Sequence, residues 1–160
     1  MHTILGAGGA VANVLTRELL QHQQPVQLVS RRPVNAKFPN VAWKKADLLH
    51  AVEVLEAVKG AHTVYLTAGL PYDKNIWKAQ WPVIMHNVIY AVKISGARLI
   101  FLDNVYMYGK VDGAIHEDTP YNPCSVKVEV SAHLATTLME EVKAGNMNAT
   151  IGRAADFYGI

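Results

Sequence analysis

The glycine-rich segment Gly6–Ala12 is the part of the sequence whose spacing most directly suggests chemistry. It follows the short apolar stretch His2–Leu5, and an amphipathic helix pattern begins at Ala10. A strand, a glycine turn and a helix N-terminus in this order present backbone N–H groups to a phosphate. Glycines permit the sharp turn and the close approach of the backbone, and Ala12 is small enough for the helix to pack on the strand. We expect a pyrophosphate at Gly6, Gly8, Gly9, Ala10 and Val11; the alternative is a turn with a structural role only.

Two arginines follow the second strand pattern, Pro25–Ser30. A site that selects NAD carries an Asp or Glu here, which accepts from the ribose hydroxyls, and this sequence has neither. The guanidiniums of Arg31 and Arg32 suit the additional phosphate of NADP instead, because a guanidinium binds phosphate through two N–H groups. We expect a preference for NADP of about ten- to a hundredfold, with NAD still possible. The alternative is a solvated pair beside Pro33.

Two further loops follow strand patterns. Asp47 is expected to accept from an adenine amine, with Leu48 against the ring; the alternative is that Asp47 is only the N-cap of a helix beginning at Leu48. Thr67, Ala68 and Gly69 are small, so the backbone there can approach the ribose and the pyrophosphate. An ordinary strand-to-helix turn would also explain these three residues.

A polar pair, Asp103 and Asn104, follows the fifth strand pattern, Arg98–Leu102. These side chains are expected where a reacting carbonyl would lie beside a bound nicotinamide, and Asn104 is the candidate catalytic residue. Tyr106 and Tyr108 follow, and aromatic residues next to strand ends usually have a packing role.

Strand and helix patterns alternate along the whole chain. The alternation predicts a parallel sheet of about six strands with helices on both faces, a doubly wound α/β fold of strand order 3-2-1-4-5-6. Ligands of such sheets bind at the carboxyl ends of the strands, where the order reverses. Residues 1–160 are expected to form one domain. The strand patterns are His2–Leu5, Pro25–Ser30, Val41–Lys45, Thr63–Thr67, Arg98–Leu102 and Ala149–Gly152, and the helix patterns are Ala10–Gln21, Leu48–Val58, Asn75–Ser95 and Ser125–Ala144.

Composition excludes several classes of protein. Of the 160 residues, 51% are hydrophobic and 18% are charged, which indicates a globular core. The net charge is only +2 and the basic residues form no stripe, so no nucleic-acid partner is expected. No membrane span or secretory signal is evident, and the single cysteine, Cys124, fits a reducing cytoplasm. Cys124 is expected to be buried or to lie at a helix entry. The seven histidines show no spacing typical of metal ligands.

The motifs together resemble the extended short-chain dehydrogenases/reductases, the group of sugar-nucleotide epimerases, dehydratases and reductases. The resemblance rests on the glycine turn, Asp47-Leu48, Thr67-Ala68-Gly69, Tyr108-Gly109 and Arg153…Phe157-Tyr158-Gly159 in this order, and it covers essentially the whole chain. It implies a Rossmann-type domain that binds NAD or NADP, and a sugar nucleotide bound by a smaller C-terminal domain. That second domain is expected to be absent from this chain, through truncation, an interrupted reading frame or a naturally short protein.

The resemblance also implies a catalytic set that this sequence lacks. Family members use a Ser or Thr after the fifth strand and a Tyr-x-x-x-Lys pair on the next helix, where the lysine lowers the pKa of the tyrosine. Here Asn104 stands in the Ser/Thr place, and Val128 and Ala132 stand near the Tyr and Lys places. The sequence therefore allows a cofactor-binding enzyme with an altered acid/base set. A non-catalytic module that senses NADP(H), or a remnant without a function of its own, is also open.

The long helix pattern is apolar over a wide arc. Family members commonly dimerise through this helix and the next, so a homodimer is expected; the alternative is a helix that its own chain buries. The residues concerned are Trp77, Trp81, Ile84, Met85, Val88, Ile89, Ala91 and Val92.

Overall fold

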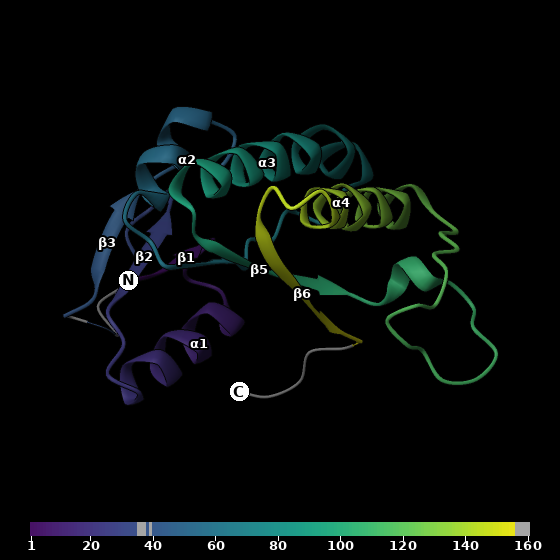
Figure 1. The fold of residues 1–160 in the computed structure, drawn as a ribbon, viewed down its shortest axis with the longest axis horizontal. Coiled ribbons are helices and arrows are strands. Elements are labelled where there is room, and N and C mark those ends of the chain that lie inside the picture. The colour runs from purple at the N-terminus through teal and green to yellow at the C-terminus, as the bar shows by residue number, and fades with distance from the viewer. Residues whose placement is uncertain (35–37, 39, 156–160) are drawn as a thin grey trace.

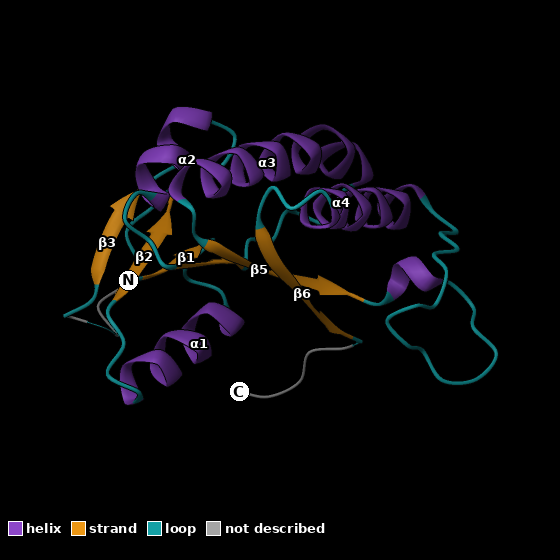
Figure 2. Cartoon of the chain, viewed as in Figure 1, coloured by secondary structure: helices purple, strands orange, loops and turns teal. Residues whose placement is uncertain are grey.

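A six-stranded parallel sheet forms the centre of the molecule (Figures 1 and 2). The computed structural model describes residues 1–34, 38 and 40–155. The strand order is β3-β2-β1-β4-β5-β6, which confirms the doubly wound order that the sequence predicts. The strands are β1 His2–Leu5, β2 Val26–Ser30, β3 Ala42–Lys45, β4 Thr63–Leu66, β5 Arg98–Asn104 and β6 Asn148–Ala154.

Central β1 pairs with both β2 and β4, so the order of the sheet reverses on the two sides of this strand. His2 is in register with Val26 on one side and with Thr63 on the other. Ile4 and Leu5 are completely buried, because β1 has neighbours in the sheet on both sides and helices over both of its faces. The carboxyl ends of β1 and β4 therefore lie side by side at one edge of the sheet, where a doubly wound fold binds its ligand.

Helices cover the two faces unequally. Helix α1 (Ala10–Gln21) lies alone on one face, whereas α2 (Ala51–Val58), α3 (Lys74–Ser95) and α4 (Val126–Lys143) lie together on the other (Figure 1). A 3₁₀ turn, η1 (Tyr106–Tyr108), follows β5. The smaller core under α1 includes Ile4, Ala12 and Leu28. The larger core joins the sheet to α2, α3 and α4, and its central elements are β4, β5 and α3.

The long helix α3 is fixed at both ends. The Asp73 carboxylate caps it by accepting from the backbone N–H groups of Asn75 and Ile76, at 2.8 and 3.0 Å, and Gly96 ends it with a φ of 68°. The apolar arc that predicted a dimer is largely covered by this chain itself. The buried residues of this arc belong to the larger core, and they are Trp81, Ile84, Met85, Val88, Ile89, Ala91 and Val92.

One local expectation was wrong. The helix expected from Leu48 begins instead at Ala51, with His50 at the N-cap position, so Asp47 is not its cap. Residues 47–50 form a separate turn, closed by the His50 N–H donating to the Asp47 carbonyl oxygen at 3.0 Å. Cys124 is exposed and lies just before the α4 N-cap, Ser125, so it is a helix-entry residue and is not buried. The motif residues 157–159 lie outside the described residues. Within the described part of the chain, no helix combines the length and apolarity that a membrane span requires.

Candidate functional site

One large cleft opens at the carboxyl edge of the sheet, with a volume of about 1290 Å³. Every residue that the sequence predicts for the site contributes to its lining. These residues come from the carboxyl ends of five different strands and the segments that follow them, which only the fold brings together. They are Gly6, Gly8, Gly9, Ala10, Val11, Arg31, Arg32, Asp47, Leu48, Thr67, Ala68, Gly69 and Asn104.

Gly6 sits where no side chain can be accommodated. Its φ is 89°, and a Cβ added to it would lie 2.4 Å from the Cα of Ala68. Its N–H donates to the Val29 carbonyl oxygen at 3.1 Å, and the N–H of Thr67 donates to the Leu5 carbonyl oxygen at 2.9 Å. The turn after β1 is therefore held against the loop after β4, and both face the cleft.

The first turn of α1 presents free backbone donors. The first hydrogen bond of the helix runs from the Asn13 N–H to the Gly9 carbonyl oxygen, 3.0 Å, so the N–H groups of Ala10, Val11 and Ala12 have no acceptor within the helix. The N-cap residue Gly9 has no side chain to cap them, and the first turn carries no acid. A Cβ on Gly9 would meet no atom within 4 Å, so space is open there. Open space in front of free N–H groups at the positive end of a helix dipole fits a phosphate.

A serine fixed by two hydrogen bonds lies at the carboxyl end of β2, and two exposed arginines follow it. Ser30 Oγ donates to the Arg32 carbonyl oxygen at 2.6 Å and accepts from Trp43 Nε1 at 2.9 Å, which fixes the backbone that carries the arginines. Among the residues with described positions, Arg31 and Arg32 form no ion pair. Both guanidiniums are therefore available to an anion in the cleft.

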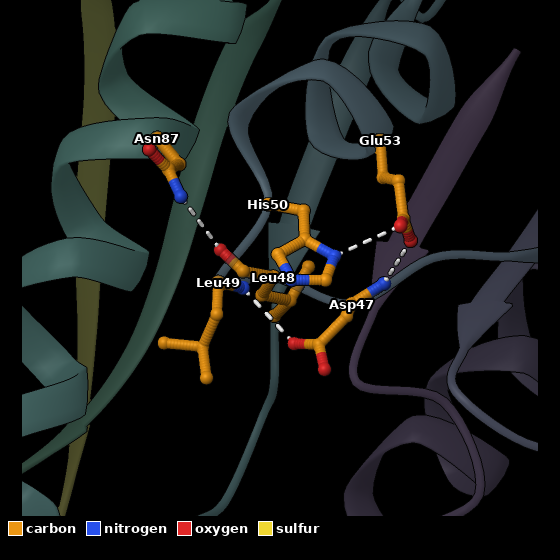
Figure 3. Close-up of polar contacts among 6 residues, drawn as sticks. All are labelled: Asp47, Leu48, Leu49, His50, Glu53 and Asn87. Atoms are coloured by element: carbon orange, nitrogen blue, oxygen red, sulfur yellow. Dashed lines mark hydrogen bonds and ion pairs between the residues drawn. The ribbon is translucent and has the colours of Figure 1, made fainter.

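Asp47 lies in a tight hydrogen-bonded turn after β3 (Figure 3). Its Oδ1 accepts from the Leu49 N–H at 3.0 Å, and its own N–H donates to Glu53 Oε2 at 2.7 Å. The other oxygen of Glu53 contacts His50 Nδ1 at 2.9 Å. The Asp47 N–H and the His50 ring lower the pKa of the Glu53 carboxyl, and Glu53 raises the pKa of His50. These bonds fix the turn, while the Asp47 carboxylate remains at the lining of the cleft.

Asn87 of α3 holds the same turn from the other side. Its Nδ2 donates to the Leu48 carbonyl oxygen at 3.0 Å, and the residue is 5% exposed (Figure 3). This contact was not predicted from the sequence, because a single Asn within an apolar helix pattern gives no sign of its partner 39 residues away.

The end of β5 carries the polar pair Asp103 and Asn104, and both line the cleft. Asn104 Oδ1 accepts from the Tyr106 N–H at 2.9 Å, so the amide is oriented by the start of η1. Asp103 is 6% exposed, and burial raises the pKa of its carboxyl to about 6, although the Asn104 N–H and Arg153 act in the opposite direction. Its Oδ2 lies 3.9 Å from Arg153 Nε, and neither atom has a hydrogen-bond partner among the described residues.

Arg153 joins β6 to the segment after β5. Its guanidinium donates to the phenol oxygens of Tyr108 and Tyr121. Tyr108 is buried and packs with Met107, Ala132 and Val128 in a small apolar cluster between η1 and α4. The packing role expected for Tyr108 is therefore observed. Val128 and Ala132 belong to the same cluster, so both carry apolar packing contacts.

The α3 and α4 side of the cleft was not predicted. Trp77, Gln80 and Trp81 of α3 and Ser131 of α4 line it. The sequence signal was present as the i, i+4 pair Trp77 and Trp81, but that spacing equally describes core packing, and Trp81 does belong to the core. No group of three or more His, Cys, Asp or Glu residues suited to a metal ion is found among the residues that the structure describes.

Sequence comparison decides the family. Residues 2–160 match the sequence profile of the NAD dependent epimerase/dehydratase family. The chain belongs to this family. No curated protein sequence gives a significant match.

Solved structures with the same fold include members of this epimerase/dehydratase group. A UDP-glucose 4-epimerase superposes with a TM-score of 0.83 at 16% identity, over 97% of this chain and 51% of its own. The Bordetella bronchiseptica enzyme WbmH, in complex with NAD+, superposes with a TM-score of 0.77 at 18% identity, over 97% and 55%. MoeE5, in complex with UDP-glucose and NAD, gives 0.76 at 22% identity, over 96% and 53%. The chain thus spans about half the length of these proteins, and at these identities the likeness concerns the fold.

Proposed function

We propose that this chain is the dinucleotide-binding part of an epimerase/dehydratase-type protein and that it prefers NADP. The observation that carries the proposal is the free backbone N–H groups at the start of α1, which face the same cleft as Arg31 and Arg32. The pyrophosphate would lie against Gly8, Gly9, Ala10 and Val11, and the adenosine end would lie between the arginines and the Asp47–Leu48 turn. Two of the solved proteins named above, WbmH and MoeE5, hold NAD, so NAD remains a possible cofactor.

The nicotinamide of such a cofactor supplies or accepts a hydride. This chain's own residues would orient the substrate oxygen beside it. Asn104 has its Oδ1 engaged by the Tyr106 N–H, which leaves the Nδ2 donors for a carbonyl or hydroxyl oxygen. An amide donates hydrogen bonds but does not relay a proton, so the acid/base set would be altered or lost. For the longer protein we propose a sugar-nucleotide substrate, by analogy with the UDP-glucose bound to MoeE5.

A non-catalytic module that senses NADP(H) is the second candidate. It is supported by Val128 and Ala132, which pack in an apolar cluster and stand near the places expected for the tyrosine and lysine of the family pattern. Neither side chain can hold or move a proton.

We also propose a homodimer that forms through the outer face of α3. Val83, Tyr90 and Ile94 are 42%, 49% and 56% exposed, and their spacing of seven and four residues places them on one stripe of the helix. A cytoplasmic location is proposed from the cysteine content, because one thiol in 160 residues suits a reducing compartment.

Titration with NADPH and NADH tests the proposal. Binding is followed by the fluorescence of the nicotinamide and by calorimetry, with NADPH expected to bind about ten- to a hundredfold more tightly. Failure of both nucleotides to bind contradicts the proposal. Hydride turnover with any sugar nucleotide favours the enzyme, and tight NADPH binding without turnover in a full-length form favours the sensor.

A further inference from the structure

A single serine hydroxyl fixes the turn that carries the two arginines. Ser30 is the last residue of β2, and its Oγ donates to the Arg32 carbonyl oxygen at 2.6 Å and accepts from Trp43 Nε1 at 2.9 Å. An indole nitrogen can only donate, so the hydroxyl accepts from Trp43 and directs its own proton to the Arg32 carbonyl oxygen. The indole therefore determines the direction of both hydrogen bonds.

Trp43 reaches this turn from the neighbouring edge strand. It is in register with Leu28 of β2, and Ser30 follows Leu28 on the same face of that strand. Trp43 is 39% exposed and belongs to none of the apolar clusters found among the described residues. It also lies outside the lining of the cleft. The bond to Ser30, and not core packing, is thus the contact that gives this large side chain a role.

The arginine turn is also tied to the glycine turn. The Val29 carbonyl oxygen accepts from the N–H groups of Gly6 and Ala7, at 3.1 and 3.0 Å. On the other side of the arginines, Val34 Cγ1 lies 3.3 Å from the position that a Cβ on Gly8 would take. The backbone on both sides of the arginines is therefore placed relative to the expected pyrophosphate site, and the Ser30 hydroxyl fixes the residues between.

The arginine side chains themselves are long and exposed. Holding such a side chain on a phosphate costs conformational entropy, and a fixed backbone reduces that cost. A displaced Arg32 carbonyl would also move the points from which both guanidiniums start. Selection of a phosphate by Arg31 and Arg32 therefore depends on the hydroxyl that holds their backbone.

We propose that Ser30 and Trp43 are positioning residues for cofactor selection, and that the chain from indole to hydroxyl to carbonyl holds residues 30–32 so that both guanidiniums meet the additional phosphate of NADP. The inference rests on the proposed function and names the residues that support its NADP preference. Ser30 uses its only proton on the Arg32 carbonyl oxygen, so the arginines supply the donors to the phosphate. Ser30 and Trp43 then affect NADP binding and leave the part shared with NAD unchanged.

Calorimetric titration of the whole chain with NADPH and NADH tests the proposal. Ser30→Ala is expected to weaken NADPH binding about three- to tenfold, since one neutral hydrogen bond is lost, and to change NADH binding by less than about twofold. Trp43→Phe keeps a ring and removes the donor, so the preference for NADPH is expected to fall in the same direction. Ser30→Thr keeps the hydroxyl and is expected to retain the wild-type preference.

Ser95→Ala is the matched control. Ser95 Oγ donates to the Val92 carbonyl oxygen at 3.1 Å at the end of α3, outside the lining of the cleft. The variant loses the same kind of bond, and both nucleotide affinities are expected to stay at the wild-type values.

A second measurement follows the indole itself in ¹H–¹⁵N spectra. The Trp43 Nε1–H signal is assigned by its absence from Trp43→Phe. It is expected to shift with 2′,5′-ADP, which carries the additional phosphate, and to stay in place with 5′-AMP, which lacks it. In Ser30→Ala the shift with 2′,5′-ADP is expected to disappear, because the connection from the arginine turn to the indole is gone.

Each contrary result has a distinct meaning. If neither nucleotide binds the wild type, the proposed function fails and the positioning role fails with it. Equal wild-type affinity for NADPH and NADH ends the NADP preference and the positioning role together, and leaves dinucleotide binding. A wild-type preference that survives unchanged in Ser30→Ala overturns the positioning role and leaves the proposed function standing. An equal loss for both nucleotides also overturns that role, since it indicates a contribution to the fold alone.

Discussion

The two halves of the cleft are built by different means. On the glycine-turn side, backbone atoms of β1, the turn and α1 form the surface, and a side chain at Gly6 would collide with Ala68. On the other side, large side chains of α3, β5 and α4 form it, with Trp77, Trp81 and Phe101 in edge-to-face contact. The first half depends on the absence of side chains at fixed positions, and the second depends on which side chains meet.

This difference makes the glycine-turn half easier to recognise in the sequence than the other half. A turn that must present N–H groups tolerates few residues, so its sequence is restricted and recognisable. A wall of side chains can change its residues while the backbone stays the same.

Gly6→Ala is expected to lower the free energy of unfolding by about 4 kcal/mol, since it combines a positive φ with a backbone collision. Gly9→Ala is the matched control, because its Cβ would meet no atom within 4 Å. Urea denaturation of both variants measures the difference. Equal free energies of unfolding for the two variants would show that position 6 tolerates a side chain, and would contradict the proposed difference between the two halves of the cleft.

Asp103→Asn tests the buried acid on the side-chain half. The pKa of Asp103 is raised from 3.8 to about 6 in the folded state, so between these values the folded state binds more protons than the unfolded state. The contribution of Asp103 to stability is therefore greatest below about pH 4 and is lost as the pH rises through 6, by about 3 kcal/mol. Unfolding measured from pH 4 to 7.5 should show the wild type losing this amount relative to the variant. Parallel curves for the two proteins would indicate an ordinary, solvated carboxyl.

Arg31→Ala is expected to weaken NADPH binding about ten- to a hundredfold, because one charge-assisted contact to a phosphate is lost. NADH binding should change by less than about threefold, since NADH lacks that phosphate. Calorimetric titration measures both affinities. An equal loss for the two nucleotides would place Arg31 at the pyrophosphate, or at no specific contact.

Tyr90 lies outside both halves of the cleft, so Tyr90→Glu is expected to change only the oligomeric state of the chain. A charge on the exposed stripe of α3 should convert the proposed dimer to a monomer in light scattering, while stability changes by about 0.5 kcal/mol or less. Val52→Glu is the control, since Val52 is 74% exposed on α2, away from the stripe. A wild-type chain that is monomeric at high concentration would contradict the dimer outright.

Prediction from sequence succeeded where the signal is local. The strand order and the bounds of most elements follow from apolar periodicity. The residues predicted for the site line one cleft, and their contacts with a cofactor stay a prediction. The prediction failed at the turn of residues 47–50. An aspartate that caps a helix and an aspartate that forms an Asx-type turn use the same side chain, and they differ only in the conformation of the backbone that follows. It also passed over Asn87, whose role depends on a carbonyl oxygen 39 residues away.

The alternation of strands and helices and the glycine turn can be read from the amino-acid sequence alone, because both depend on the conformational preferences of neighbouring residues. Three further features are visible only in the folded chain: which groups share the cleft, the burial of the apolar arc of α3 by its own chain, and the raised pKa of the Asp103 carboxyl. Burial, desolvation and contact between distant residues arise when separate elements pack together, and no stretch of neighbouring residues encodes them.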